Sequence, residues 1–163
     1  MDAIDALRAA LASRGEPLVP ATLAAVETTE RRLSRELPRA LRRVYLELAD
    51  GTAGTAGAQA LLALDELGPP GGLDPAQEVV PLEGGARLRA RTLIALTEED
   101  VDGGQWCLLA DGRVAYFLPL AGEPGLHLPL PDVDALLGVL AATGGGEAVV
   151  AMGGVDRLGL SPR

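Results

Sequence analysis

The chain has 163 residues, of which 48% are hydrophobic and 2% aromatic, and its formal net charge is −9. This length and composition predict one domain whose core is built mainly from Leu, Val and Ala. The absence of lysine excludes Schiff-base chemistry and a Walker A nucleotide site, and a single histidine excludes multi-histidine metal centres.

The N-terminal third contains apolar residues at helical spacing. A short first helix is predicted around Ile4, Leu7 and Leu11. A longer helix is predicted to begin near residues 21–22, and its apolar face is formed by Leu23, Val26, Leu33 and Leu37. The spacing places Glu30 on that same face.

The dipeptide Leu37-Pro38 predicts a break between two helices. Proline pushes the residue before it out of helical geometry, but it suits the first position of a new helix. The new helix has one apolar face, formed by Leu41, Val44, Tyr45 and Leu48. Gly51, after Asp50, is expected to supply the left-handed residue that ends this helix. The break therefore predicts a corner that turns two apolar faces toward one core.

The remaining segments form a run of strands followed by a helix. In chain order, the pattern predicts a loop (51–60), a strand for which a helix stays an alternative (61–67), a proline-rich loop (68–85), a strand (87–96), an acidic turn (97–104), a two-residue hairpin at Asp111-Gly112 (105–120), a helix (131–146) and a last strand or tail (147–152). This order predicts a single α+β domain with a mainly antiparallel sheet, flanked by N-terminal helices and a C-terminal helix.

The pattern formed by Glu30, Leu33, Leu37 and Pro38, followed by "VYLELADG" at 44–51, resembles the opening signature of the SUKH superfamily. These Smi/Knr-like proteins include bacterial immunity proteins and fungal cell-wall regulators. "TLIALTEED", "DGRVAYF" and "PDVDALLGVL" follow in a similar order, so the resemblance spans roughly residues 20–143. The chain departs from the family at Ser34, where members often have Gly, at Asp50, where they often have Asn, and in its few aromatic residues.

The resemblance implies an α+β fold and a non-catalytic role in binding another protein, in bacteria often a toxin domain. An adaptor or regulatory domain of a housekeeping assembly is the alternative, and a small hydrolase is a more distant one. No cofactor and no metal ion is predicted.

Two interpretations apply to Glu30. Its carboxylate could serve in a pocket, as an acid or as a partner contact. Alternatively, it accepts main-chain N–H groups near the start of the helix at Pro38, where first-turn donors need acceptors. We favour the second interpretation.

A basic run extends from Arg31 to Arg43 and holds six arginines and one acid, Glu36. A protein partner could recognise such a patch on an acidic molecule. We favour the simpler view that these arginines cover the solvent-exposed face of two helices.

Several other candidates carry little chemistry. Cys107 and His127 could pair as nucleophile and base, but neither has a recognisable catalytic context. The spacing of Glu98, Glu99, Asp100 and Asp102 does not fit a calcium-binding EF-hand loop. "GTAGTAG" lacks the Lys-Ser/Thr ending of a phosphate-binding loop.

As the surface for a basic protein partner we choose the acidic turn with Trp106 beside it.

The expected location is the cytoplasm. The lone cysteine, Cys107, cannot form an internal disulfide and is typical of a reducing compartment. Asp2 and Asp5 stand where a signal peptide would carry positive charge. Glycines 144–146 interrupt the least polar region, so we predict no membrane span. The negative charge disfavours nucleic acid as a partner.

Overall fold

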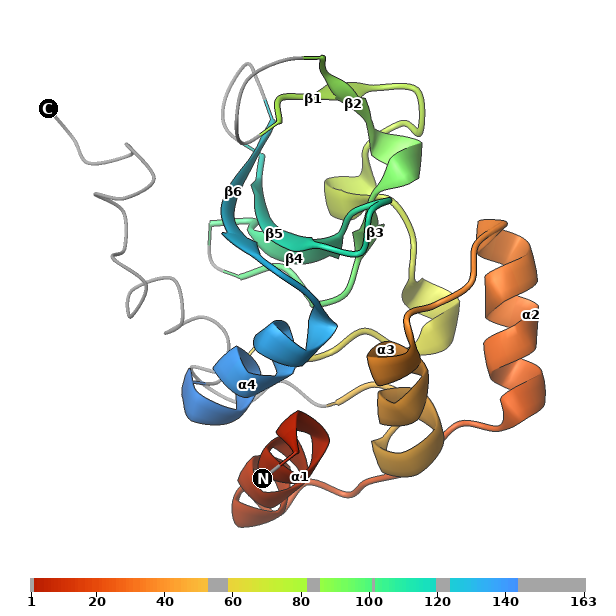
Figure 1. Ribbon diagram of the computed structural model, residues 1–163, viewed down its shortest axis with the longest axis vertical. Helices are drawn as coiled ribbons and strands as arrows, with labels where there is room; N and C mark the ends of the chain where they lie inside the picture. The colour runs from red at the N-terminus through yellow and green to blue at the C-terminus, as the bar shows by residue number, and fades with distance from the viewer. Residues whose placement is uncertain (1, 53–58, 82–85, 101, 120–123, 144–163) are drawn as a thin grey trace, which may run out of the picture.

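The computed structural model describes residues 2–52, 59–81, 86–100, 102–119 and 124–143. Its architecture is α+β, as the sequence predicted: N-terminal helices, a four-stranded antiparallel sheet, and a C-terminal helix that packs against the first helix. The sheet lies at one end of the molecule and the helices at the other (Figure 1). The expected glycine-rich loop at 53–58 and the expected strand or tail at 147–152 lie outside the described residues.

The first and last helices form a pair at the bottom of Figure 1. Helix α1 (Ala3–Ser13) is capped by Asp2, whose carboxylate accepts the Ile4 N–H at 3.0 Å. Helix α4 (Val133–Thr143) is capped in the same way by Asp132, which accepts the Ala135 N–H at 2.9 Å. Both helices contribute to the main core, so the predicted N-terminal helix is part of the folded body.

Helix α2 (Leu23–Leu33) begins after Thr22, as predicted, and faces the body through Val26. The predicted apolar face is wrong at Leu23, whose exposed fraction is 51%. The helix contacts its neighbours through the side that holds Val26, the buried Thr29 and the partly buried Leu33. Leu23 lies in the first turn and is rotated away from that side, so its side chain remains in solvent.

The next helix has two parts, an α-helical turn α3 (Arg39–Arg43) and a π-helical turn η1 (Val44–Leu48). The predicted apolar face is confirmed, because its members are each 1% exposed: Leu41, Val44, Tyr45 and Leu48. Pro38 is the N-cap rather than the first helical residue. Its ψ of 147° is extended, and helical geometry begins one residue later.

Gly51 does not end this helix, contrary to the prediction. The helix stops at Leu48, and Ala49 is already extended, because the N–H of Asp50 donates to the Val19 carbonyl at 2.8 Å and pulls the chain away. Gly51 still has a positive φ of 84°. A Cβ at this position would lie 3.0 Å from the Ala63 nitrogen, so the glycine allows a close approach of two loops.

The four-stranded sheet has the order β3 (Ile94–Ala95), β4 (Gln105–Leu108), β5 (Val114–Leu118), β6 (Gly125–Leu130). The predicted β4–β5 hairpin is present, but its loop has three residues, not two. The Gly112 N–H donates to the Leu109 carbonyl at 3.1 Å, and Gly112 has a φ of 91°. This is a turn followed by a left-handed residue, the usual three-residue hairpin loop.

Two predicted strands are largely wrong. Segment 61–67 has one isolated bridge, Leu61 to Thr97, and then a 3₁₀ turn, η2 (Leu64–Glu66). The Asp50 carboxylate accepts the Leu64 N–H at 2.9 Å and thereby starts that turn. The predicted strand at 87–96 is divided among β2 (Leu88–Arg89), a 3₁₀ turn η4 (Ala90–Thr92) and β3. Strand β2 pairs with β1 (Glu78–Val79) in a separate ribbon.

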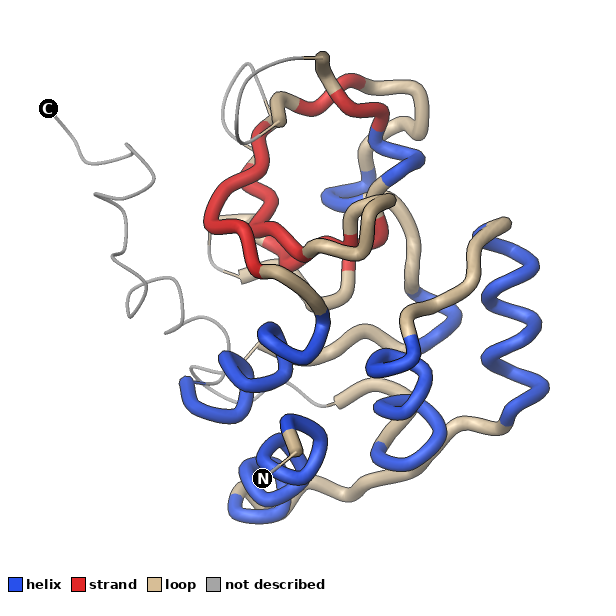
Figure 2. The backbone as a smooth tube through the Cα atoms, viewed as in Figure 1, coloured by secondary structure: helices blue, strands red, loops and turns tan. Residues whose placement is uncertain are grey.

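Both faces of the four-stranded sheet are buried, so the molecule has two cores. The strands curl within one end of the molecule (Figure 2). Residues on one face, such as Trp106 and Tyr116, join the helices in the main core. Their neighbours Cys107 and Phe117 point to the other face and form a smaller core. The members of that smaller core are Val79, Ala90, Leu93, Ala95, Cys107, Leu109, Ala115, Phe117 and Leu126.

Candidate functional site

The acidic turn, residues 98–100 and 102–104, is organised by the carboxylate of Asp100. One of its oxygens accepts the N–H groups of Asp102 at 2.9 Å and of Gly104 at 2.8 Å. The other accepts the hydroxyl of Tyr116, which belongs to β5. Asp100 is therefore a structural anchor that ties the turn to the sheet.

Three polar side chains hold the two ends of this turn together. Gln59 donates its amide to the carbonyls of Glu98 at 3.0 Å and Gly104 at 3.1 Å. The hydroxyl of the fully buried Thr97 accepts the Trp106 N–H at 3.0 Å, and the Thr97 carbonyl accepts the Gln105 amide at 2.8 Å. The backbone of the turn is thus fixed without any partner.

The remaining acids of the turn point outward. The side chains of Glu98, Glu99 and Asp102 are exposed. Within the described part of the chain, their carboxylates make no hydrogen bond or ion pair. The turn therefore presents three unpaired negative charges on a fixed backbone.

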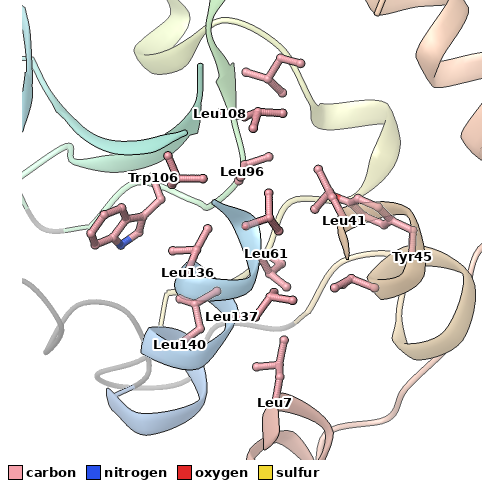
Figure 3. Packing of buried hydrophobic residues seen from close by; sticks show 14 of the residues in the cluster. Leu7, Leu41, Tyr45, Leu61, Leu96, Trp106, Leu108, Leu136, Leu137 and Leu140 are labelled. Carbon is pink, nitrogen blue, oxygen red and sulfur yellow. The ribbon is translucent and has the colours of Figure 1, made fainter. Parts of the chain in front are cut away.

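Trp106 does not belong to this surface, contrary to our prediction. Its exposed fraction is 0%, and Figure 3 shows it among leucines of the main core. The reason is that β4 is covered on both faces, so no side chain of this strand reaches solvent. The Trp106 ring instead lies 5.3 Å from the ring of Tyr116, at an interplanar angle of 57°.

Sequence reasoning missed the roles of Gly104 and Tyr116. A Cβ on the buried Gly104 would lie 1.8 Å from the Tyr116 hydroxyl oxygen, so the tyrosine crosses directly over the glycine. Burial, and then the hydrogen bond to Asp100, raise the pKa of the Tyr116 hydroxyl well above its usual value. The "DGG" at 102–104 could signal a tight turn, but nothing local indicates which ring covers it.

The second organised bend is the elbow between α2 and α3, residues 34–38, and its anchor is Glu30. The Glu30 carboxylate accepts the Leu37 N–H at 2.9 Å and lies 3.7 Å from Nε of Arg42. The Glu30 carbonyl accepts the Arg35 N–H at 3.1 Å. The Glu30 carboxylate does accept a main-chain N–H, as the favoured interpretation expects, but the donor precedes Pro38, and no side chain in the described part of the chain caps the first turn of α3.

Ser34 turns the chain at the end of α2. Its φ of 51° and ψ of 38° are left-handed, and its N–H donates to the Arg31 carbonyl at 3.2 Å. With the bond from Arg35 to Glu30, this makes a Schellman motif, which usually has glycine at this position. The two leucines of the SUKH-like pattern, Leu33 and Leu37, pack in the core. Leu37 is 4% exposed, and Leu33 is partly buried against the main core.

The favoured view that the arginines of the basic run only cover a solvent-exposed face is incomplete, because two of them bind main-chain carbonyls. Arg32 donates to the carbonyls of Leu64 at 2.9 Å and Leu67 at 2.8 Å. Arg35 donates to the carbonyls of Thr92 and Leu109. These guanidinium groups connect α2 to the loops around the sheet, so that part of the run is structural.

Cys107 and His127 are not brought together. Cys107 pairs with Ala115 and faces the smaller core, whereas His127 pairs with Tyr116 on the opposite face. Burial raises the pKa of the Cys107 thiol well above its usual range, which disfavours the reactive thiolate. Burial lowers the pKa of the His127 imidazole.

The described residues contain no group of three or more His, Cys, Asp or Glu side chains arranged to bind a metal ion. In the same residues, every helix is too short or too polar to cross a bilayer. No protein-family model matches the chain, and no curated protein or solved structure matches it either. The resemblance to the SUKH superfamily thus rests on the residues quoted above.

Proposed function

We propose that this chain is a non-catalytic, SUKH-like module that binds another protein, and that its partner is a basic domain such as a toxin neutralised by an immunity protein. The acidic turn is the proposed contact surface. Binding would occlude the partner sterically and electrostatically. The partner's own chemistry would then be blocked without any reaction on this chain.

The observation that carries the proposal is the fixed backbone under the exposed acids. Asp100 and Gln59 hold the turn from inside, while Glu98, Glu99 and Asp102 carry charge outside. A surface that is already ordered loses less conformational entropy on binding. Complementary charge mainly speeds association and selects against partners of the same sign.

The elbow supports the proposal from a second direction. The residues that resemble the SUKH signature have clear structural roles here: the Glu30 carboxylate accepts the Leu37 N–H, and the Leu37 side chain is buried. Ser34, where family members often have glycine, is left-handed. The motif therefore behaves as a structural signature rather than as a set of catalytic groups.

The test is capture of partners from extracts of the source cells by three immobilised proteins. The first is the wild type, and the second replaces the exposed acids of the turn, Glu98→Gln, Glu99→Gln and Asp102→Asn. The third is a matched control that neutralises three acids elsewhere, Glu16→Gln, Glu36→Gln and Asp134→Asn. All three should give the same circular dichroism spectrum and melting temperature.

We expect the wild type and the control to retain a basic protein that the turn variant loses, most strongly at low salt. The retained protein should be toxic when expressed alone and tolerated when this chain is co-expressed. Equal capture by all three proteins would contradict the proposed surface. Retention of only housekeeping proteins would favour the adaptor alternative.

A further inference from the structure

Helix α2 has a solvent-facing side that is distinct from the acidic turn. The helix lies at the edge of the molecule, with its outer side away from the sheet (Figure 1). The exposed residues of that side are Leu23, Ala24, Glu27, Thr28 and Arg31. Leu23 is 51% exposed, although burying a leucine side chain away from water is favourable.

The two charges on this side, Glu27 and Arg31, form no ion pair among the described residues. Glu27 and Arg31 are one helical turn apart, a spacing at which opposite charges often pair. In the described residues, however, the Glu27 carboxylate makes no ion pair, and Arg31 donates to the Thr28 hydroxyl at 3.2 Å. One acid and one base therefore stand side by side, each available to a partner.

A shallow hollow of about 500 Å³ continues this side past the end of α2. Its lining combines α2 with the elbow: Glu27, Glu30, Arg31, Ser34, Arg35 and Glu36. From its N-terminus onward, this side of α2 therefore presents the exposed Leu23, then Glu27, then Arg31, and finally the hollow.

We propose that this side of α2 binds the same side of α2 in a second copy of the chain, with the two helices antiparallel about a two-fold axis. A two-fold contact requires a self-complementary surface. If the axis passes level with residue 29, Glu27 of each copy faces Arg31 of the other. The same register sets Leu23 opposite residue 35, over the hollow of the second copy. The small side chains of Ala24 and Thr28 allow the helices to approach closely.

The contact is modest in size, which sets the expected affinity. Eleven residues of helix extend about 16 Å, so this pairing buries less than the roughly 1,600 Å² of a standard interface. We therefore expect a weak dimer, monomeric in dilute solution and assembled at high concentration.

Sedimentation equilibrium of the full chain, from about 10 μM to about 1 mM, tests the proposal. Glu27→Arg places two arginines opposite each other, and Arg31→Glu places two glutamates opposite each other. Each single variant should weaken self-association by at least about tenfold, which corresponds to about 1.4 kcal/mol. An equimolar mixture of the two variants should restore dimerisation, because the introduced arginine of one chain then faces the introduced glutamate of the other.

Two further variants check the geometry. Leu23→Asn removes the apolar group proposed to enter the hollow and should also weaken the dimer, while Asp134→Arg on α4 should leave it unchanged. A chain that stays monomeric at the highest concentration would overturn the proposal. So would a dimer that is indifferent to both charge reversals, or one that the mixture fails to restore. None of these residues belongs to the acidic turn, so partner capture and self-association can fail independently.

Discussion

Two bends of this molecule, the elbow and the acidic turn, are each organised by one carboxylate that accepts main-chain hydrogen bonds, one N–H at the elbow and two at the turn. At the elbow, Glu30 holds Leu37 and lies near Arg42, all within a short stretch of chain. At the acidic turn, Asp100 holds its own turn and also the Tyr116 hydroxyl, which comes from the middle of the sheet. The elbow is a local device, whereas the turn depends on the core beneath it.

This difference determines how far the effect of a substitution should extend into the core. A defect at the elbow loosens one helix junction, while a defect at the turn moves Tyr116 and, through it, the buried Trp106. We therefore expect changes at the turn to cost more free energy of unfolding than changes at the elbow.

The largest effect is expected for Gly104→Ala. The new Cβ would lie 1.8 Å from the Tyr116 hydroxyl oxygen and 2.2 Å from its ring carbon Cζ, so the ring must move out of the main core. Overpacking of this kind typically costs 1–3 kcal/mol, and we expect about 3 kcal/mol here because a hydrogen bond is lost as well. Urea unfolding followed by circular dichroism measures the change. Gly112→Ala is the control. Gly112 lies in the hairpin loop, where an added Cβ would meet no atom within 4 Å, so the loss of stability should come only from backbone strain and be smaller. Equal losses would show that Tyr116 adapts.

Asp100→Ala is expected to cost about 2–3 kcal/mol, since it leaves two main-chain N–H groups and the Tyr116 hydroxyl without their acceptor. Asp102→Ala is the matched control. Its side chain is exposed and accepts no hydrogen bond from the described residues, so its effect should stay within about 0.5 kcal/mol. Thermal melting of both variants separates the anchor of the turn from the charge that the turn displays. Similar melting temperatures would refute the assignment of Asp100 as the anchor.

Glu30→Ala is expected to cost about 1–2 kcal/mol, the usual range for loss of a carboxylate that accepts a main-chain N–H. Glu30→Gln keeps an acceptor oxygen and gives up only the longer contact with Arg42, so it should cost less. Glu36→Ala, an exposed acid of the same elbow, should be neutral. Chemical denaturation of the three variants ranks them. If the glutamine variant loses as much as the alanine variant, charge rather than the hydrogen bond dominates.

Ser34→Gly should be the smallest change and a stabilising one, by about 0.5–1 kcal/mol. A left-handed backbone is unfavourable for serine and free of this cost for glycine. Ser13→Gly is the opposite control, because Ser13 is helical at the end of α1 and glycine is a poor helix former. Differential scanning calorimetry should show opposite shifts of the melting temperature. A destabilised Ser34 variant would mean that the serine contributes more than its backbone conformation.

The features that the sequence predicted well are those determined by neighbours in the chain. The apolar spacing of α1 and α3–η1, the break at Leu37-Pro38, the presence of the β4–β5 hairpin and the main-chain hydrogen bond to Glu30 all follow from periodicity and local turn chemistry. The spacing predicts Leu23 on the buried face of α2, but its side chain is exposed. In the first turn of a helix, the same spacing is compatible with either side. Gly51 was misplaced because a long-range bond from Asp50 to Val19 ends the helix early.

The features that the sequence did not predict depend on contacts between distant segments. Segment 61–67 has the composition of a strand, but the Asp50 carboxylate accepts the Leu64 N–H, and residues 64–66 form a 3₁₀ turn. Trp106 was assigned to the surface because it follows an acidic turn, and only the covering of both sheet faces explains its burial. Nothing in the pattern indicates that Tyr116 crosses Gly104, or that Arg32 binds the carbonyls of Leu64 and Leu67.

Pairing at the margins of the sheet has a consequence for the way in which this chain can be recognised. Along β3, Ala95 donates to the Gly68 carbonyl, so that margin is already hydrogen bonded. Along β6, Leu126 donates to Val80, Leu128 has a φ of 49°, and Pro129 has no N–H to give. An extended peptide would therefore find no continuous row of amides to join on these two strands. A ligand that docks against these two strands would therefore be recognised by side chains, and its specificity there should follow charge and shape instead of backbone pairing.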